Sequence, residues 1–318
     1  MTDSRISPIP NHAPTFLDLP LCTDLTTLDA DVAIIGVPYT VPYNLNASRQ
    51  PSSTAPETIR IQSNRFAQYL RHYDFDFNGP ILTGRKVRIV DCGNVAMRAG
   101  KYVENAANVT SAIEAILARR AVPFVLGGDH AVPIPVWRAY QRYEPFYIVQ
   151  IDAHIDWRDE REGIRDGLSS PMKRASEMTW VNGMAQIGMR GIGSARSEEV
   201  AAAKAYGSLI ISADEVHEIG VTAILKRIPE RSRYYITIDI DGLDPSIAPG
   251  VGSPTYGGLT YPETLGLLRG IAEKGTMVGY DLVEVRPEVD VQSLTSYLAA
   301  RLTFVMLGCL SYTKQIGK

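Results

Sequence analysis

Cysteine is scarce in this sequence, and its spacing excludes two common kinds of scaffold. The three cysteines, Cys22, Cys92 and Cys309, lie far apart and form no Cys-x-x-Cys pair. An odd number of widely spaced cysteines argues against a disulfide framework and against a zinc site made of thiolates. We therefore expect three buried, reduced thiols.

Long hydrophobic runs, leader segments and basic runs are missing as well. Residues 1–16 contain three prolines and several charged residues, but no apolar core of a signal peptide. No later stretch approaches the roughly 20 apolar residues of a membrane span. The 35 acidic and 32 basic residues give a net charge of −3, which points away from nucleic acids and anionic membranes. We expect a cytoplasmic protein with a small-molecule partner.

Linkers, repeats and low-complexity segments are also absent, and strand-like and helix-like segments alternate along nearly the entire chain. With 318 residues, 45% of them hydrophobic, the chain could form one large α/β domain or two ordinary ones. The unbroken alternation favours one domain, residues 1–318, with residues 1–30 as an N-terminal extension, and it predicts a parallel sheet. The strand candidates are Asp31–Val37, Val87–Asp91, Pro123–Leu126, Phe146–Ile151, Ala185–Gly188, Leu209–Ser212, Tyr234–Ile238 and Met277–Val285.

The helix candidates follow from apolar periodicity and from capping residues. They are Val109–Arg120 after Asn105, Ser197–Tyr206, Thr222–Ile228, Pro262–Lys274 after the N-cap Thr260, and a closing helix Ser293–Gly308. Two segments interrupt the alternation: Tyr39–Thr58, rich in Pro, Asn, Ser and Thr, and Trp157–Met178, dense in charge. Long irregular segments in compact domains are often functional, so both are candidates for shaping a pocket.

Residue types that bind metals gather in three short runs, each directly after an apolar, strand-like segment. The runs are Gly127–His130, Asp152–Asp156 and Asp239–Pro245. Sites in α/β proteins lie at the carboxyl ends of parallel strands, so we expect these runs to lie together. Alternate spacing in the second run puts its three polar side chains on one face of an extended chain. The predicted metal ligands are His130, Asp152, His154, Asp156, Asp239 and Asp241.

The charge of these ligands fits a pair of divalent cations. Four aspartates carry about −4, which two divalent cations would neutralise, whereas four crowded carboxylates alone would repel one another. Oxygen-rich ligands with two imidazoles favour Mn²⁺ first, with Ni²⁺, Co²⁺ or Zn²⁺ as alternatives. A single Asp-x-Asp is more often a helix cap or a surface turn than a ligand pair, but that interpretation weakens when the three runs are combined.

The three runs resemble the signatures of the ureohydrolase family, the arginase and agmatinase group. Those signatures are Gly-Gly-Asp-His, Asp-Ala-His-x-Asp and Ser-x-Asp-x-Asp-x-x-Asp-Pro, followed by Pro-Gly and Gly-Gly-Leu. This chain has all of them, with Thr237 in place of the leading serine, and the match extends from about Ile34 to Gly308. The resemblance implies a three-layer α/β/α fold with an eight-stranded parallel sheet. It also implies two metal ions, usually manganese and in some relatives nickel, and a homo-oligomer, either a trimer or a hexamer.

The resemblance further assigns the ligands to the two ions. Two aspartates, Asp152 and Asp239, would bridge both. The first ion would be held by His130, Asp152, Asp156 and Asp239, and the second by Asp152, His154, Asp239 and Asp241. Two cations about 3.5–4 Å apart would turn a bridging water into hydroxide that attacks the guanidinium carbon.

Two acidic residues and one aromatic residue have further expected roles. Asp156 would orient the hydroxide, and Glu284 falls where the family's guanidinium-binding glutamate lies. A carboxylate can hold a planar guanidinium through charge-assisted hydrogen bonds. The alternative for Glu284 is an ion pair with Arg286 or a loop arginine. Trp157, beside a metal ligand, is either an aromatic wall that faces a cationic substrate or a side chain packed under the loop.

The chain departs from the family pattern in two loops. Relatives commonly carry a proton-shuttle histidine about a dozen residues after Asp-Ala-His-x-Asp, where this chain has Leu168, and no histidine lies between His154 and His217. Leucine cannot transfer a proton, so the leaving amine must be assisted by another group, by water or not at all. The early loop Ser48–Pro56 also differs from the family pattern, and we expect both loops to set specificity.

The leading hypothesis is therefore a binuclear-metal hydrolase that cleaves a C–N bond, other than a peptide bond, in a small guanidine-type compound. Agmatine, 4-guanidinobutyrate, guanidine itself and biguanides such as metformin are the candidate substrates that the resemblance implies. A second hypothesis, motivated by the missing histidine, is a non-catalytic or weakly active subunit that retains its metals and works with a paralogous subunit. A third, amide deacetylation on the related fold, would use one zinc ion.

Overall fold

A nine-stranded sheet forms the centre of the molecule in a computed structural model that describes residues 3–7, 9, 13–41, 43, 53–82, 86–193 and 195–317. The strand order is β1-β5-β2-β6-β11-β10-β7-β8-β9. Eight of these strands run parallel, as predicted, and the short β1 (Ile6–Ser7) pairs antiparallel with β5. The parallel strands are β2 (Val32–Val37), β5 (Ile89–Val95), β6 (Val122–Gly127), β7 (Phe146–Ile151), β8 (Val181–Met189), β9 (Leu209–Ser212), β10 (Arg233–Asp239) and β11 (Thr276–Val283).

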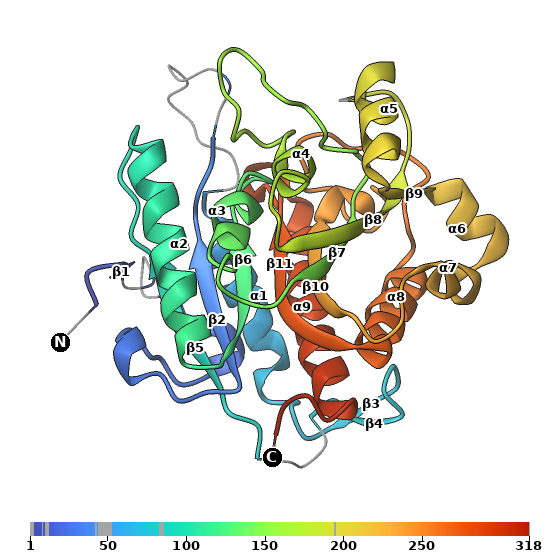
Figure 1. The fold of residues 1–318 in the computed structure, drawn as a ribbon. Coiled ribbons are helices and arrows are strands. Elements are labelled where there is room, and N and C mark those ends of the chain that lie inside the picture. Colours follow the sequence, from blue (N-terminus) through green and yellow to red (C-terminus); the bar gives the residue numbers. More distant parts are fainter. Residues whose placement is uncertain are drawn as a thin grey trace.

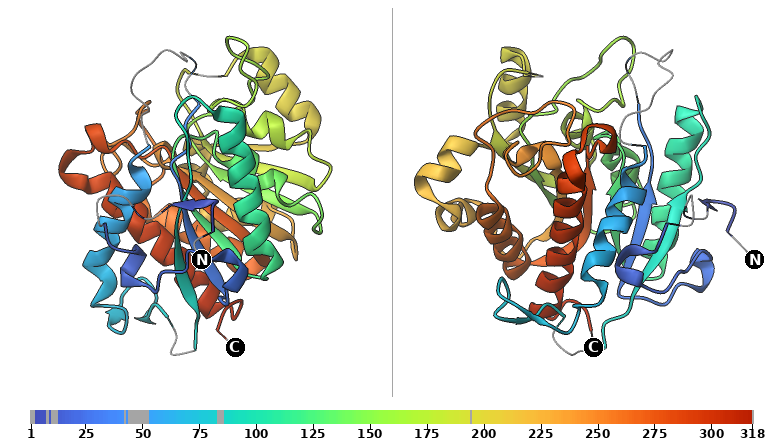
Figure 2. Two further views of the ribbon diagram at one scale, coloured as in Figure 1. Left: turned by 90° about the vertical axis from the view of Figure 1, so that its left-hand side faces the viewer. Right: turned by 180° about the vertical axis from the view of Figure 1, so that it is seen from behind.

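Helices cover both faces of this sheet and complete the three layers that were predicted (Figures 1 and 2). One face packs against α1, α8 and α9, with α6 and α7 at the same side, and the other packs against α2, α3, α4 and α5. The helices are α1 (Ala55–Ala67), α2 (Tyr102–Ala118), α3 (Pro133–Arg138), α4 (Pro171–Ala175), α5 (Ser197–Tyr206), α6 (Ala213–Ile219), α7 (Val221–Arg227), α8 (Tyr261–Lys274) and α9 (Leu294–Tyr312). A separate small ribbon pairs β3 (Tyr73–Asp74) with β4 (Gly79–Pro80).

All eight strand candidates are strands, because each is an apolar run long enough to cross a buried sheet. The bounds of β7 and β9 are those that were predicted, and α5 likewise. The predicted N-cap Thr260 is confirmed: its side chain accepts a hydrogen bond from the Glu263 amide, and Glu263 bonds back to the Thr260 amide. This reciprocal capping box fixes where α8 begins.

The helix predictions were wrong where local composition hides helical structure. α1 begins inside the segment predicted to be irregular, and α3 carries prolines at its first and third positions. Proline is tolerated in the first helical turn, so it marks a helix start here instead of a break. α2 begins at Tyr102, before the predicted start, because Asn105 does not cap it: the Asn105 side chain pairs with the backbone of Arg98.

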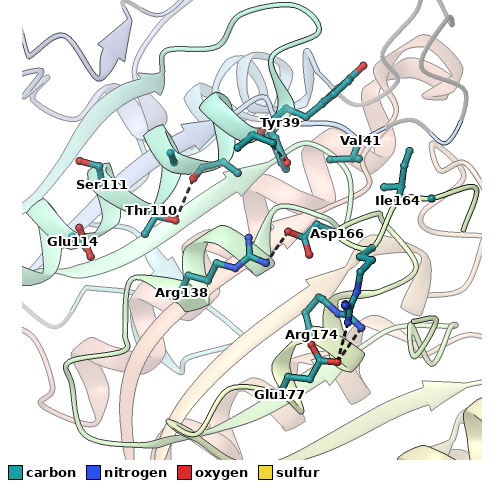
Figure 3. A pocket seen from close by; sticks show the side chains of 16 residues that line it. Tyr39, Val41, Thr110, Ser111, Glu114, Arg138, Ile164, Asp166, Arg174 and Glu177 are labelled. Carbon is teal, nitrogen blue, oxygen red and sulfur yellow. Dashed lines mark hydrogen bonds and ion pairs between the residues drawn. The ribbon is translucent and has the colours of Figure 1, made fainter. Parts of the chain in front are cut away.

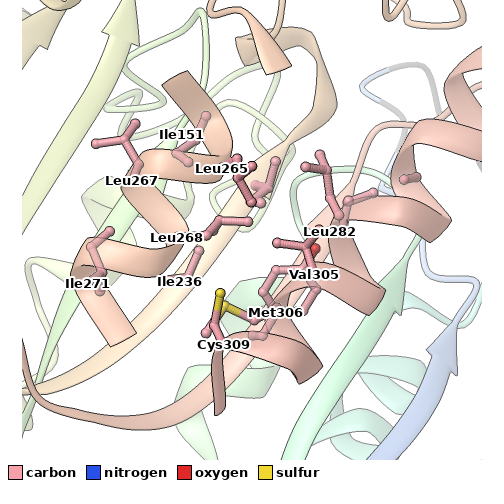
Figure 4. Packing of buried hydrophobic residues seen from close by; sticks show 14 of the residues in the cluster. Ile151, Ile236, Leu265, Leu267, Leu268, Ile271, Leu282, Val305, Met306 and Cys309 are labelled. Carbon is pink, nitrogen blue, oxygen red and sulfur yellow. The ribbon is translucent and has the colours of Figure 1, made fainter. Parts of the chain in front are cut away.

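The core on the α8 and α9 side consists of aliphatic side chains from the sheet and from both helices (Figure 4). Ile151 and Ile236 from the strands meet Leu268 of α8 and Met306 of α9 there. Contrary to the expectation from sequence, one segment, Val291–Tyr312, is long and apolar enough to resemble a membrane span. Most of that segment is buried inside the protein, which is how a central core helix differs from a lipid-facing one.

Two of the three free cysteines, Cys92 and Cys309, are buried as predicted, whereas Cys22 is only partly buried. The Cys22 thiol donates a long hydrogen bond of 3.5 Å to the Asp24 carbonyl at the surface turn before a short 3₁₀ helix. Its position in the N-terminal segment, which runs along the outside of β5, explains the exposure. The prediction of three buried thiols was therefore wrong for Cys22.

A fully buried ion pair joins the N-terminal segment, α1 and β5. Arg60 of α1 donates to Asp91 of β5 through Nε at 2.7 Å and Nη2 at 2.9 Å, and both side chains have 0% exposure. Arg60 also donates to the Asn94 side chain and the Gly93 carbonyl, while Asp91 accepts from the Phe16 amide. Every charged atom of this pair is thereby satisfied, as a buried ion pair requires.

Candidate metal centre

The predicted ligands come together at the carboxyl edge of adjacent strands. His130 follows β6, Asp152 follows β7 and Asp239 ends β10. Ligand atoms of these three residues lie within 4.8 Å of one another, and the same holds for Asp152, His154 and Asp241. Asp152 belongs to both groups. The arrangement follows from the register, because the last residue of β7 lies beside Ile238, one residue before Asp239.

Glycines let the backbone close in around this edge. A Cβ on Gly128 would lie 2.1 Å from the Tyr39 carbonyl oxygen, and one on Gly242 would lie 2.7 Å from the Asp152 amide nitrogen. Real Cβ atoms do not approach so closely, so only glycine fits. The close backbone approach predicted for the Gly-Gly turn is thus present, and it carries His130 over the end of β11.

Asp156 and Glu284, the two residues with predicted catalytic roles, both adopt left-handed backbone conformations. Their φ angles are 47° and 66°. Such conformations cost a non-glycine residue about 1–3 kcal/mol and persist where the surrounding structure enforces them. At Glu284 the enforcing contacts include its amide donating to the Gly128 carbonyl at 2.8 Å and its carboxylate accepting from the His130 amide at 3.0 Å.

The imidazole of His130 fits a metal ligand. Its Nδ1 lies 3.0 Å from Asp152 Oδ2, 2.8 Å from Asp156 Oδ2 and 3.4 Å from Asp239 Oδ2, and it has no partner with hydrogen-bond geometry. Its Nε2 lies 3.2 Å from Thr237 Oγ1, a contact that places the ring proton there and leaves a lone pair on Nδ1. Three carboxylate oxygens around one buried imidazole nitrogen need positive charge between them, which a bound cation would supply and which a ring proton supplies in its absence. The residues therefore fit the divalent metals that the sequence predicted.

A row of four buried polar residues crosses the sheet beneath the ligands. Gln186 of β8 lies beside Gln150 of β7, Gln150 beside Thr237 of β10, and Thr237 beside Asp281 of β11. All four side chains have 0% exposure. We call these residues the polar row. The row was not predicted from the sequence, although each of these apolar strand runs contains one polar residue, which is the signal that could have revealed it.

Members of the polar row hold the ligands from behind. Thr237 Oγ1 donates to Asp281 Oδ1 at 2.6 Å and so turns a lone pair toward His130 Nε2. Gln150 Nε2 donates to Asp152 Oδ2 at 2.6 Å. Contacts of this kind orient metal ligands and fix the histidine tautomer. Thr237 keeps the hydroxyl of the serine that it replaces in the family pattern, and the hydroxyl is the part that makes these bonds.

The ligand carboxylates and imidazoles perturb one another strongly. Burial and the neighbouring Asp152 carboxylate raise the pKa of Asp156 to about 7, and burial together with Asp241 and Asp152 raises the pKa of Asp239 well above its ordinary range. Burial acts against the charged form of His154, but Asp152 and Asp241 outweigh it and raise the His154 pKa to about 12. Without metals, protons supply the positive charge that holds this cluster together.

This proton binding predicts how metal and pH affect stability. Groups whose pKa is raised by folding stabilise the metal-free protein below their unfolded pKa, and this stability is lost as the pH rises through the folded pKa. For Asp156 the window is about pH 4 to 7, and for His154 it begins near pH 6.5. We expect the melting temperature of chelator-treated protein to fall between pH 5.5 and 8.5.

Added Mn²⁺ should restore the stability most at the alkaline end, because metal ligands must be deprotonated. At a free metal concentration 100 times the Kd the gain is about 2.7 kcal/mol. Thermal unfolding with and without metal at three pH values measures both effects. A melting temperature at pH 8.5 that is the same with and without Mn²⁺ would contradict the assignment of these ligands.

A cavity of about 360 Å³ opens onto the ligands. Its wall includes His154, Asp156, Asp239, Asp241 and Glu284 on the sheet side. The charge-dense segment predicted to shape a pocket does so: Arg158, Arg161, Leu168 and Ser169 line the cavity, and this segment lies at the top of Figure 1. The early loop Ser48–Pro56, which was also predicted to set specificity, lies mostly outside the described residues. Leu168 itself faces the cavity, so this position supplies no proton.

Trp157 does not line this cavity. It is 3% exposed and packs in the hydrophobic core on the α2 side, with its ring 5.6 Å from that of Tyr206. Of the two alternatives for Trp157, the structure therefore has the side chain packed under the loop. The aromatic-wall prediction was wrong, and Trp157 is not retained as a substrate-binding residue.

Glu284 lines the cavity and also forms the ion pair with Arg286 that was its alternative. Its carboxylate lines the cavity and is 6% exposed, and its Oε2 lies 3.7 Å from Nη2 of Arg286. That separation is too long for a hydrogen bond, so the Arg286 contact is an ion pair without directional bonding. Burial raises the pKa of Glu284, against the lowering effect of Arg286. A guanidinium at hydrogen-bond distance would therefore be a stronger partner than Arg286.

A larger hollow of about 930 Å³ lies elsewhere, beside α2 and α3 (Figure 3). Its wall contains none of the predicted ligands. Ion pairs border it, with Arg138 Nη2 at 2.7 Å from Asp166 and Arg174 Nη2 at 3.1 Å from Glu177. Size alone would have selected this hollow, but the two groups of candidate metal ligands lie beside the smaller cavity.

Comparisons with known proteins agree with the geometry. Residues 30–308 match the sequence model of the Arginase family. The chain is 31% identical over 296 residues to an agmatinase of Blochmanniella floridana, which covers 92% of each chain. It is 31% identical over 325 residues to a guanidinopropionase of Pseudomonas aeruginosa, covering 95% of this chain and 93% of the relative.

Among solved structures, the fold resembles that of proclavaminate amidino hydrolase from Streptomyces clavuligerus. The TM-score is 0.83 at 28% sequence identity, over 98% of this chain and 100% of the other. The likeness thus extends over essentially the full length of both chains, including all of the strands that carry the candidate ligands.

Proposed function

The chain belongs to the arginase family, and from this premise we propose that it is a binuclear-metal hydrolase that cleaves a C–N bond of a small guanidine-type compound. Enzymes of this family cleave C–N bonds other than peptide bonds. One observation carries the proposal for this chain: five of the six potential ligands form two groups that share Asp152, and the cavity beside them is lined by Asp156 and Glu284. Mn²⁺ is the proposed ion, with Ni²⁺ as the alternative.

Each side chain has a defined task in this proposal. When bound, a pair of divalent cations lowers the pKa of a coordinated water and so supplies a nucleophile near neutral pH. Asp156, at the cavity wall, orients that nucleophile with its carboxylate. Glu284 holds the guanidinium of the substrate through charge-assisted hydrogen bonds, which position its central carbon. The polar row keeps the ligands fixed while the reaction proceeds.

A second candidate function has one observation in its favour. Leu168 lines the cavity at the position where relatives commonly have a proton-shuttle histidine. A chain without that histidine could serve as a metal-retaining subunit that depends on a paralogous partner for activity. Co-expression with a paralogue separates the two: activity that arises only in the mixture, and that survives Asp156→Asn in this chain, would favour the partner role. A homo-oligomeric state is proposed on the family resemblance alone, and the cytoplasmic location stays a prediction from the sequence.

Glu284→Gln is expected to separate substrate binding from metal binding. Glutamine keeps an oxygen that accepts from the His130 amide but loses the charge, so the metal content should stay at two ions per chain. A charge-assisted hydrogen bond contributes about 1.5–3 kcal/mol, so kcat/KM should fall roughly 10- to 100-fold, mainly through KM.

Elemental analysis and the release of urea and amine measure these two quantities on the same samples. Glu288→Gln is the matched control, because Glu288 is exposed and lies outside the cavity wall four residues later. The panel comprises agmatine, 4-guanidinobutyrate, guanidine and metformin after Mn²⁺ or Ni²⁺ loading. A metal-loaded protein that turns over none of them, alone or with a paralogue, would refute the proposed function.

A further inference from the structure

Three arginines line the same cavity as the metal ligands: Arg158, Arg161 and Arg286. Their presence is unexpected in a site for a cation, because a guanidinium substrate already carries a positive charge. Two divalent cations would balance the four ligand aspartates, and Glu284 would balance the substrate guanidinium. The positive charges of the arginines are then left to interact with the rest of the substrate.

Arg161 is held in a rigid position at the cavity wall. It begins a tight two-residue turn in which its amide donates to the Ile164 carbonyl at 3.0 Å and its carbonyl accepts from the Ile164 amide at 2.9 Å. Glu162 and Gly163 in the turn have φ angles of 55° and 80°, the pattern of a type I′ hairpin. The hairpin therefore fixes the backbone from which the Arg161 side chain extends.

The Arg161 guanidinium has only weak partners among the described residues. Its Cζ lies 4.4 Å from the centroid of the Tyr43 ring, and Tyr43 is anchored by the Ser169 amide, which donates to its hydroxyl at 2.9 Å. Its ion pair with the exposed Glu162 is 3.9 Å long. A guanidinium on a ring face keeps its N–H donors in its own plane, where they can bind an anion.

Arg286 is the second anion-binding candidate. Its amide donates to the Gly250 carbonyl at 2.8 Å, and its guanidinium lies against Gly252, where a Cβ would come within 2.2 Å of Arg286 Cζ. Its Nε is buried and has no hydrogen-bond partner among the described residues. Its ion pair with Glu284 is 3.7 Å long. An anion nearby would satisfy this side chain and release Glu284 for the substrate guanidinium.

Arg158 adds positive charge but is already engaged. Its Nε lies 3.5 Å from Glu199, which offsets part of its charge. The cavity wall thus contains two arginines that lack strong partners and a third that is partly neutralised. An amine at the end of the substrate would be repelled by this wall, whereas a carboxylate would gain two bidentate-capable donors.

We propose that the substrate is a guanidino acid: its guanidinium binds at Glu284 beside the metal ligands, and its carboxylate binds Arg161 and Arg286. This inference rests on the proposed function and specifies its substrate class. It selects compounds with an anionic tail over agmatine, whose tail is an amine, and over guanidine and metformin, which have no anionic group.

Three compounds with the same guanidine and the same four-carbon chain test the proposal. They are 4-guanidinobutyrate, n-butylguanidine and agmatine, with a carboxylate, a neutral and a cationic end. We expect kcat/KM for the acid to exceed that for both others by about 10-fold or more, the range of one charge-assisted hydrogen bond. A preference for agmatine or n-butylguanidine, or equal rates for all three, would overturn the proposal and leave the proposed function standing.

Arginine variants assign the preference to residues. Arg161→Gln and Arg286→Gln should each lower the ratio of acid to n-butylguanidine turnover by about 10-fold, mainly through KM of the acid, and Arg161→Lys should retain part of it. Arg165→Gln is the matched control, since Arg165 lies on the same segment but lines the larger hollow instead. An unchanged ratio in both glutamine variants would overturn the assignment.

Calorimetric binding keeps the two proposals distinguishable. It measures the affinity of wild type and Arg161→Gln for 4-guanidinobutyrate and agmatine without any need for turnover. Wild-type protein that binds the acid more tightly than agmatine, and loses this preference in Arg161→Gln, would support the anion site. If that protein is also inactive on every guanidine, the proposed hydrolase function is refuted. Equal affinity for both compounds would refute the anion site whatever the activity.

Discussion

Replacing Asp239 by asparagine is expected to remove bound metal and guanidine hydrolysis together. Asp239 ends β10 with its side chain 4% exposed, and its carboxylate belongs to the group with His130 and Asp152. Asparagine preserves shape but removes one negative charge from a site that must balance two divalent cations. Metal catalysis accounts for most of the rate in such a mechanism, so activity should fall by more than about 10³-fold.

Elemental analysis beside urea release measures the two losses. Asp166→Asn is the control, because Asp166 pairs with Arg138 at the separate hollow and lies outside the metal cavity. Asp239→Asn should keep the wild-type fold, and its circular dichroism spectrum checks this. Two metal ions per chain with wild-type turnover in Asp239→Asn would show that the metal centre has been misassigned.

Arg60→Met is expected to cause the largest loss of stability of any single substitution considered for this chain. The change leaves Asp91 charged, fully buried and without its ionic partner, and it also removes donors to Asn94 and the Gly93 carbonyl. Breaking a buried pair on one side costs about 3–5 kcal/mol. Because Asp91 also accepts from the Phe16 amide, the N-terminal segment should loosen with it.

Denaturant unfolding at a fixed metal concentration measures the change in free energy. Arg88→Met provides the comparison, since Arg88 is 53% exposed and pairs with Asp29 and Asp31 at the surface. Such pairs contribute about 0–1 kcal/mol. Similar losses in the two variants would mean that the buried pair is not a major source of stability. If Arg60→Met does not accumulate as soluble protein, Arg60→Lys gives a milder version of the same comparison.

The sheet and the ligands could be predicted because both depend on short-range patterns. A run such as Phe146–Ile151 is apolar at every position except Gln150 and predicts a buried strand, and the polar residues that follow it must emerge where the strand ends. Parallel strands bring such ends to one edge. His130 and Asp239 therefore lie close together although they are 109 residues apart in the sequence.

The polar row and the cavity wall could not be predicted in the same way. Gln150 looks like an isolated polar residue until the strand register places it beside Thr237 and Gln186. Arg161 and Arg286 come from distant segments, and nothing in either segment shows that both face one cavity. For Trp157 the sequence left two alternatives open, and only the packing of its ring against the core decides between them.

The polar row also divides the site into two parts that can change independently. Two of the candidate ligands are held to the sheet by this row: Gln150 donates to Asp152, and Thr237 contacts His130 and donates to Asp281. Arg161 and Arg286 extend from segments that follow the strands and line the cavity. Evolution or engineering can therefore replace the arginine-bearing segments by segments of another charge without changing the strands that hold the candidate metal ligands. Grafting a neutral hairpin in place of residues 161–164 is the corresponding design experiment.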